Sequence, residues 1–219
     1  MTKLTYIDLS HNSINGTFPN ISNMLSLQTV LLHHCNFTGS LPDVMNAPLL
    51  SSYAVNSNQL IGVIPRFKHV PLLQFIYMDN NYLNGTLDSL WIDMCNIRQH
   101  LSPLSISVII LSNNKITGAL SIKPPCVCPV NVFIAENNGL SGTIPSWLFC
   151  PNITAFNVNH DPELTGNLPF PAGESVLPLK VLGISQTKLQ GPSGIRMFRR
   201  LLNLQELYNN IADYHNLRT

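Results

Sequence analysis

Histidine is the residue of this chain whose spacing most suggests chemistry. His11 and His34 are 23 residues apart, and His33 directly precedes the second of them. If the chain returns to the same place with that period, His11 and His34 stand side by side and could bind a metal ion or respond to pH. We favour the ordinary interpretation, surface histidines beside a polar ligand groove, and we predict no metal site.

The remaining residues offer no catalytic arrangement. The sequence contains no GxSxG, HExxH, P-loop or GxGxxG motif, and its eleven carboxylates are scattered without a paired arrangement. We therefore expect no enzyme activity and no cofactor.

The elements that must position these side chains are copies of one repeat. Residues 130–145, VNVFIAENNGLSGTIP, fit the template LxxLxLxxNxLxGxIP. A period of this length is typical of a solenoid. We predict one elongated α/β repeat domain over residues 1–219, with about eight to nine repeats and a parallel sheet on its concave face, including strands at 7–10, 30–33 and 53–56. The other copies begin at Leu4, Leu27, Leu50, Leu73, Ile106, Ile153, Leu179 and, much degraded, Leu204.

Two columns of residues support this register. A glycine at one fixed position indicates a backbone requirement, where the chain bends or a neighbour comes too close for a Cβ. The side chains of the second column can all form hydrogen bonds, so we interpret them as a structural ladder, with Cys35 as a buried free thiol. The glycine column is Gly16, Gly39, Gly62, Gly85, Gly118, Gly142, Gly166 and Gly191. The ladder column is Asn12, Cys35, Asn58, Asn81, Asn114, Asn138, Asp161 and Thr187.

Residues 88–105 form an insert between the regular repeats 4–87 and 106–191. Their apolar residues recur at helical spacing, which predicts a short amphipathic helix packed on the solenoid. The alternative is an island that projects to bind a ligand. Residues 192–219 form a degraded last repeat or a partial cap. The residues with helical spacing are Leu87, Leu90, Trp91, Met94, Ile97 and Leu101.

The cysteines are better explained by repeat register than by zinc binding. Cys128 and Cys150 lie two and three residues before the equivalent repeat starts Val130 and Ile153. They therefore occupy nearly the same place on adjacent coils, within disulfide range. We predict a Cys128–Cys150 disulfide, with Cys95 and Cys126 as a less certain pair.

Composition favours a surface that faces the extracellular medium. Charged residues make up only 11% of the chain and the net charge is +1, so nothing favours nucleic acid or an anionic membrane as a partner. No apolar run approaches the length of a membrane span. We expect the chain to be a fragment of a longer protein, whose other parts would supply any membrane attachment. Five glycosylation sequons, expected in exposed turns, stand at Asn15, Asn20, Asn36, Asn84 and Asn152.

Several strings of the sequence resemble the plant-specific class of leucine-rich repeats. They are DLSHNSINGTFP at 8–19, FTGSLP at 37–42, LSGTIP at 140–145 and LTGNLP at 164–169. The resemblance covers roughly residues 4–191 and implies a right-handed superhelical solenoid with a second short strand in each coil. That class forms the extracellular part of receptor-like kinases and receptor-like proteins, secreted polygalacturonase inhibitors and some protist surface proteins. The resemblance thus implies an inner surface that binds peptides, small hormones, wall glycans or co-receptors.

Side-chain alternation predicts which residues line that inner surface. In LxxLxLxxN the third and fifth residues point outward from the concave strand. In copies four to six these positions are apolar, and polar residues border them, as is typical of an interaction site. The alternatives are that β-propensity alone put valine and isoleucine there, or that the insert folds over the patch. The predicted site is Phe75, Tyr77, Val108, Ile110, Val132 and Ile134, with Asp79 and Glu136 at its border.

From these features we predict an extracellular recognition module, a segment of a receptor-like kinase or receptor-like protein that binds a peptide or protein partner, and possibly a co-receptor, on its concave face. We expect it at the outer face of the plasma membrane or secreted. The alternative is a secreted structural or adhesion protein of the cell wall, including one that binds as polygalacturonase inhibitors do, without signalling output.

Overall fold

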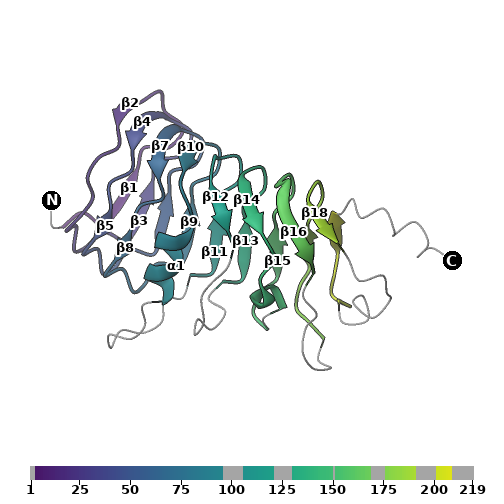
Figure 1. Ribbon diagram of the computed structural model, residues 1–219. Helices are drawn as coiled ribbons and strands as arrows, with labels where there is room; N and C mark the ends of the chain where they lie inside the picture. Colours follow the sequence, from purple (N-terminus) through teal and green to yellow (C-terminus); the bar gives the residue numbers. More distant parts are fainter. Residues whose placement is uncertain are drawn as a thin grey trace.

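Nine short parallel strands form the main sheet, here called the inner sheet. The computed structural model describes residues 3–95, 106–120, 130–149, 151–168, 176–190 and 201–208. Each strand lies beside the strands of the neighbouring copies, so each repeat adds one strand to the sheet (Figure 1). The coils are numbered one to nine by these strands. The strands are β1 (Tyr6–Asp8), β3 (Thr29–Leu31), β6 (Ser52–Ala54), β9 (Phe75–Tyr77), β11 (Val108–Ile110), β13 (Val132–Ile134), β15 (Ala155–Asn157), β17 (Val181–Gly183) and β19 (Glu206–Tyr208).

This arrangement confirms the predicted leucine-rich repeat solenoid with a parallel sheet. The predicted strand limits at 7–10, 30–33 and 53–56 were wrong, because the observed strands begin one residue earlier and end two residues earlier. The chain turns soon after each strand, where His11, His34 and Ser57 have φ angles of 52–55°. A residue in this left-handed conformation cannot continue an extended strand.

A second short strand in most coils builds two further parallel sheets, here called the lateral sheets. One has the order β10-β7-β4-β2 and the other β12-β14-β16-β18. Among the described residues, a single isolated bridge between Thr86 and Thr117 links them, at the level of the insert. Their strands are β2 (Asn15–Thr17), β4 (Asn36–Ser40), β7 (Gln59–Val63), β10 (Tyr82–Asn84), β12 (Thr117–Ala119), β14 (Gly139–Gly142), β16 (Glu163–Asn167) and β18 (Lys188–Gln190).

The glycine column lies in these lateral sheets, where neighbouring coils come closest. Gly85 has a φ of +79°, and a Cβ at this position would lie 2.9 Å from Cγ1 of Val63 in the coil below. Every described glycine of the column has a positive φ. The column is therefore a backbone requirement, as predicted. Its last member, Gly191, lies outside the described residues.

The asparagine column forms a hydrogen-bond ladder that is buried at Asn58 and Asn81, partly buried at Asn114 and Asn138, and exposed at Asn12. Oδ1 of Asn81 accepts from the Leu60 N–H at 3.0 Å, and its Nδ2 donates to the carbonyls of Val55 and Met78. Asn58, Asn114 and Asn138 repeat this pattern, so their role is structural, as predicted. Cys35 in the same column is buried with a free thiol, which was also predicted, and its Sγ donates to the Leu9 carbonyl at 3.1 Å.

The insert begins with helix α1 (Asp88–Cys95), which confirms the predicted helix over these residues. Leu90 and Trp91 of α1 are buried. The Trp91 ring lies 5.6 Å from Phe133 and 5.9 Å from Trp147, which belongs to the 3-10 helix η1 (Ser146–Phe149). The helix is thus part of the core. Residues 96–105, with the rest of the predicted helical pattern, lie outside the described residues.

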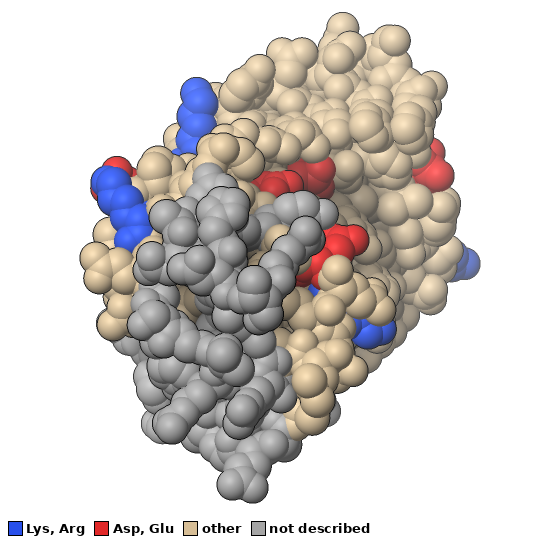
Figure 2. Space-filling model, turned by 90° about the vertical axis from the view of Figure 1, so that its right-hand side faces the viewer, with Lys and Arg blue, Asp and Glu red and all other residues tan. Residues whose placement is uncertain are grey.

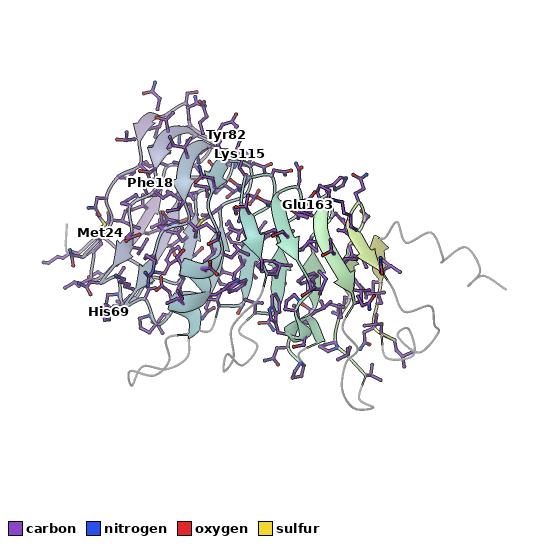
Figure 3. The ribbon with its side chains drawn as sticks, in the orientation of Figure 1. Phe18, Met24, His69, Tyr82, Lys115 and Glu163 are labelled. Atoms are coloured by element: carbon purple, nitrogen blue, oxygen red, sulfur yellow. The ribbon has the colours of Figure 1, made fainter. Side chains whose placement is uncertain are left out.

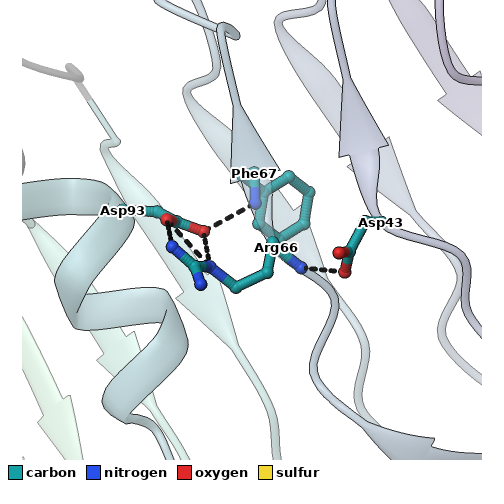
Figure 4. A network of polar contacts seen from close by, with 4 residues as sticks. All are labelled: Asp43, Arg66, Phe67 and Asp93. Atoms are coloured by element: carbon teal, nitrogen blue, oxygen red, sulfur yellow. Dashed lines mark hydrogen bonds and ion pairs between the residues drawn. The ribbon is translucent and has the colours of Figure 1, made fainter.

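An ion pair also fixes α1 to the solenoid. Arg66 stands just before the short strand β8 (Phe67–Lys68), which pairs with β5 (Val44–Met45) of the coil below. Asp93 accepts hydrogen bonds from Nε and Nη2 of Arg66 and from the Phe67 N–H (Figure 4). The Arg66 N–H donates to Asp43 at 2.7 Å. This network joins three successive coils on one flank.

Candidate ligand-binding face

Side-chain alternation divides each strand of the inner sheet between the core and one open face. In coils four to six the central residues Ile76, Ile109 and Phe133 are fully buried. Their neighbours on both sides are half-buried and point the other way. These neighbours are Phe75, Tyr77, Val108, Ile110, Val132 and Ile134, and together they are called the inner patch.

The strand register brings the inner patch together as two rows. Val108 pairs with Phe75 on one side and Val132 on the other, while Ile110 pairs with Tyr77 and Ile134. Parallel strands lie about 4.8 Å apart, so side chains in one row touch. The rings of Phe75 and Tyr77 are parallel, with centroids 6.5 Å apart. The six predicted residues therefore share one continuous surface.

The two rows of the inner patch end at β15, the next strand of the inner sheet, which carries the polar residue Asn157. Ala155 and Asn157 follow Val132 and Ile134 in register on β15. Nδ2 of Asn157 donates to the Glu136 carboxylate at 2.8 Å. Glu136 thus closes one border of the inner patch, where the sequence placed it.

Asp79 borders the inner patch in coil four. Partial burial raises the pKa of its carboxyl group, while a hydrogen bond from Asn80 and the nearby His34 and His33 lower it. Nδ2 of Asn80 donates to Asp79 at 2.6 Å. In the described residues Asp79 has no ion-pair partner. The partly buried carboxyl group of Asp79 thus lies beside the two apolar rows of the inner patch.

Three asparagines that the sequence places at this polar border form an exposed amide ladder, whose hydrogen bonds were not predicted. Nδ2 of Asn113 donates to Oδ1 of Asn80 at 2.9 Å, and Nδ2 of Asn137 donates to Oδ1 of Asn113 at 2.8 Å. All three residues have φ angles near 56°, a conformation that asparagine tolerates well. The signal was present, because each residue directly precedes a ladder asparagine and forms an Asn-Asn pair in three successive copies.

The predicted contact between His11 and His34 is present. Their rings stack with centroids 4.6 Å apart, and His33 packs against them at 5.1 and 5.5 Å. Burial lowers the pKa of His33, and its two neighbouring imidazoles lower it further. In the part of the chain that the structure describes, no group of three His, Cys, Asp or Glu side chains could hold a metal ion.

The sequons are exposed, but they are not all in turns. Asn15, Asn36 and Asn84 lie in β2, β4 and β10, so the prediction of turn positions was wrong for these three. Their side chains still reach solvent, because alternation directs them away from the core. Asn20 and Asn152 lie outside the strands and are also exposed.

The predicted Cys128–Cys150 disulfide lies outside the described residues, as does Cys126. Nothing in the structure therefore bears on that prediction. Within the described ranges, no helix is long and apolar enough to cross a membrane.

Charge is unevenly distributed over the end of the coil. Figure 2, seen from the C-terminal side, shows acidic side chains in the middle of the visible surface and Lys and Arg mainly towards its edges. On the lateral sheets, Nζ of Lys115 lies 5.3 Å from the centre of the Tyr82 ring (Figure 3). Lys188 pairs with Glu163 at 2.9 Å. The positive charges of Lys115 and Lys188 therefore lie on the lateral sheets, away from the inner patch.

Comparisons with known proteins agree with this architecture. A sequence model of the family described as Leucine Rich Repeat matches residues 3–24 and 26–47. No curated protein matches the sequence.

Solved structures of plant proteins share the fold. One is the Arabidopsis receptor kinase HAESA in complex with the peptide hormone IDA and the co-receptor SERK1, at 18% identity and a TM-score of 0.63, with 94% of this chain and 42% of that chain covered. Another is the plant peptide hormone receptor RGFR1 in complex with RGF2, at 17% identity, a TM-score of 0.62 and coverage of 96% and 44%. A plant ice-binding protein matches at 19% identity and a TM-score of 0.67, with coverage of 93% and 64%.

The chain spans less than half the length of these two receptor structures. The matched repeats at residues 3–47 and the shared architecture show that the chain has a leucine-rich repeat fold like that of these plant receptors.

Proposed function

We propose that this chain is an extracellular recognition module that binds a peptide or protein partner on the open face of the inner sheet, over coils four to six. The observation that carries the proposal is the inner patch, six apolar or aromatic side chains in register on three neighbouring strands. Apolar surface of this kind with a polar border marks an interaction site.

Tyr77 is the proposed anchor of the partner. Its ring is half-buried and stacked on Phe75, so little side-chain freedom remains to be lost on binding. Aromatic side chains near the centre of an interface supply a large share of binding energy. The described part of the insert leaves the patch open, because α1 packs beside β8 and its Trp91 enters the core.

Two of the solved structures support a peptide or protein as the class of partner. HAESA and RGFR1 share this fold and are held in complexes with a peptide hormone and RGF2 respectively, and HAESA also with a co-receptor. A receptor-like kinase or receptor-like protein at the outer face of the plasma membrane, with a peptide ligand and a co-receptor, is the corresponding proposal here. Exposed sequons at Asn15 and Asn84 support secretion.

The test measures whether surface variants of the secreted chain still capture a binding partner. The probe is a biotinylated chain incubated with extracellular peptides and proteins from the source tissue and then cross-linked. Tyr77→Ala should lose the captured partner, whereas Thr165→Lys on β16, an exposed lateral position, should retain it. Equal capture by both variants would reject the inner patch. Capture of a wall polysaccharide alone would favour the secreted adhesion alternative.

A second candidate function is binding of ice on the lateral sheets. The residues that flank the glycine column are uncharged and mostly short, although the strand register sets Glu163 beside Ser141 and Lys188 beside Thr165 on the same sheet. The plant ice-binding protein shares the fold. Hydroxyl and methyl groups repeated at strand spacing could order water with the same repeat. On the C-terminal lateral sheet no strand carries a sequon, so glycans would leave it uncovered. The flanking residues there are Thr117, Ala119, Ser141, Thr143, Thr165 and Asn167.

Ice recrystallisation in the presence of the purified chain separates the two candidates. An ice-binding chain keeps crystals small, and Thr165→Lys removes this effect while Tyr77→Ala retains it. Crystal growth equal to that of a serum albumin control would reject the second candidate and leave the first unaffected.

A further inference from the structure

Asp161 occupies the ladder position of coil seven, where five other coils have asparagine. Its side chain is completely buried. A carboxylate is costly to bury without full hydrogen bonding, whereas an amide at this place is satisfied by the main chain. The substitution of an acid for an amide therefore needs a physical account.

The asparagine of the coil below shows which groups surround this position. Oδ1 of Asn138 accepts from the Ile116 N–H at 3.0 Å, and its Nδ2 donates to the carbonyls of Leu111 and Ala135 at 3.1 and 3.0 Å. The main chain around Asn138 thus offers a donor to the side-chain oxygen and acceptors to the side-chain nitrogen.

Asp161 reproduces half of this pattern. Its Oδ1 accepts from the Leu140 N–H at 2.9 Å, as an asparagine oxygen does. Its Oδ2 is buried and has no hydrogen-bond partner. By the repeat, Oδ2 lies where the amide nitrogen lies in the other coils, towards the carbonyls of Ala135 and Val158. An ionised carboxylate would aim a lone pair at these acceptors.

We infer that Oδ2 of Asp161 carries a proton in the folded protein and donates it to the Ala135 carbonyl of coil six. This adds to the bond from the Leu140 N–H a second hydrogen bond between coils six and seven, which exists only while Asp161 is protonated. The carboxylic acid then imitates the amide of the other ladder positions, with one acceptor oxygen and one donor. Below the pKa of Asp161 both ladder hydrogen bonds are present in coil seven. Above it only the bond from the Leu140 N–H remains.

The electrostatic surroundings support this assignment. Burial raises the pKa of Asp161 to about 7, with a smaller contribution from the negative charge of Glu136, while the main-chain N–H groups of Leu140 and Asn138 act in the opposite direction. Glu136 is the charged group that faces it from coil six. On its own coil, His160 and Glu163 are exposed, and Glu163 is paired with Lys188 of coil eight.

The sign of the pH dependence follows from linkage. The pKa of this acid is higher in the folded than in the unfolded chain, so between about pH 4 and pH 7 the folded state binds more protons. The stabilisation is complete below the unfolded pKa and is lost as the pH rises through the folded one. Because the folded and unfolded pKa values differ by about three units, the ratio of folded to unfolded protein changes by up to about a thousandfold over this pH range.

The test compares the full chain with Asp161→Asn, which restores the ladder residue of the other coils and should fold. Urea denaturation is measured from pH 4 to pH 9. The wild type should lose stability relative to Asp161→Asn as the pH rises, with the variant clearly more stable at pH 9. Infrared spectra should show the carbonyl band of a buried carboxylic acid in the wild type at pH 5, absent from the variant.

Glu136→Gln provides the matched control, because it removes the neighbouring charge and leaves Asp161 in place. It should keep the infrared band at pH 5 and shift its loss to a lower pH, because the negative charge of Glu136 raises the pKa of Asp161. Parallel pH profiles for wild type and Asp161→Asn, or the same infrared band in both, would overturn the inference. Asp161 would then be ionised, with its Oδ2 solvated by buried water.

Discussion

Asp93 and Arg66 form the best-shielded ion pair of the described residues. Nη2 of Arg66 lies 2.6 Å from Oδ1 of Asp93, and the side chain of Asp93 is only 4% exposed, against 63% for Glu163 in the exposed pair with Lys188. The Phe67 N–H donates to the other carboxylate oxygen. One acid therefore anchors α1 to both the side chain and the main chain of the coil below.

Asp93→Ala is expected to destabilise the protein by about 1 to 3 kcal/mol. The loss reflects a broken charge-assisted contact and an unpaired N–H at Phe67, and it is moderated because Arg66 is partly exposed. Urea denaturation measures the effect. Lys188→Ala, which breaks the exposed pair with Glu163, is the control and should change the stability by less than about 0.5 kcal/mol. Equal effects of the two variants would mean that α1 does not depend on this anchor.

Gly118→Val should destabilise the fold by about 1 to 3 kcal/mol, because valine resists the conformation required there. Gly118 has a φ of +83°, and a Cβ would lie 3.0 Å from Cγ2 of Thr86. The melting temperature checks this, with Thr117→Val on the same strand as a control that keeps a β-branched side chain. A melting temperature equal to that of the wild type would refute the assigned repeat register.

Tyr77→Ala and Ile134→Asp should abolish binding of the partner while leaving the melting temperature nearly unchanged. Both side chains lie on the open face, whereas their strand neighbours Ile76 and Phe133 carry the core. Calorimetric melting and the capture assay measure the two properties separately. If either substitution greatly lowers the melting temperature, the inner patch is core and the proposed site is wrong.

Tyr53→Phe is expected to stabilise the protein by about 1 kcal/mol or more. The Tyr53 ring is fully buried among Phe18 and Phe67, and its hydroxyl has no hydrogen-bond partner. Removing an unsatisfied buried hydroxyl removes its desolvation cost. Burial also raises the pKa of this phenol, so it stays neutral and the gain should not vary between pH 6 and pH 9. A loss of stability would indicate a buried water bound to the hydroxyl.

Most of the features that the sequence predicted correctly are ones that repeat; helix α1 is an exception, and the exposed amide ladder is a repeating feature that was not predicted. The register of Phe75 with Val108 and Val132 follows from spacing, since each copy places its third residue alike. The ends of the strands were misplaced because the turn depends on a left-handed residue that is His11 in one copy and Ser57 in another. The contact between Arg66 and Asp93 has no counterpart in other copies, so periodicity carries no information about it.

In the described residues, one isolated bridge, between Thr86 and Thr117, joins the two lateral sheets, and the inner sheet is continuous across this boundary. Pairs within the inner sheet, such as Tyr6 with Thr29, join residues 23 apart, and the insert lengthens the step from Phe75 to Val108 to 33. Closing the longer loop costs only about 0.3 kcal/mol more by chain entropy. Each new coil needs only its neighbour as a template, so folding can advance from either half and meet at coils four and five. The same boundary is where further residues can be inserted with the least disturbance to hydrogen bonding on either side.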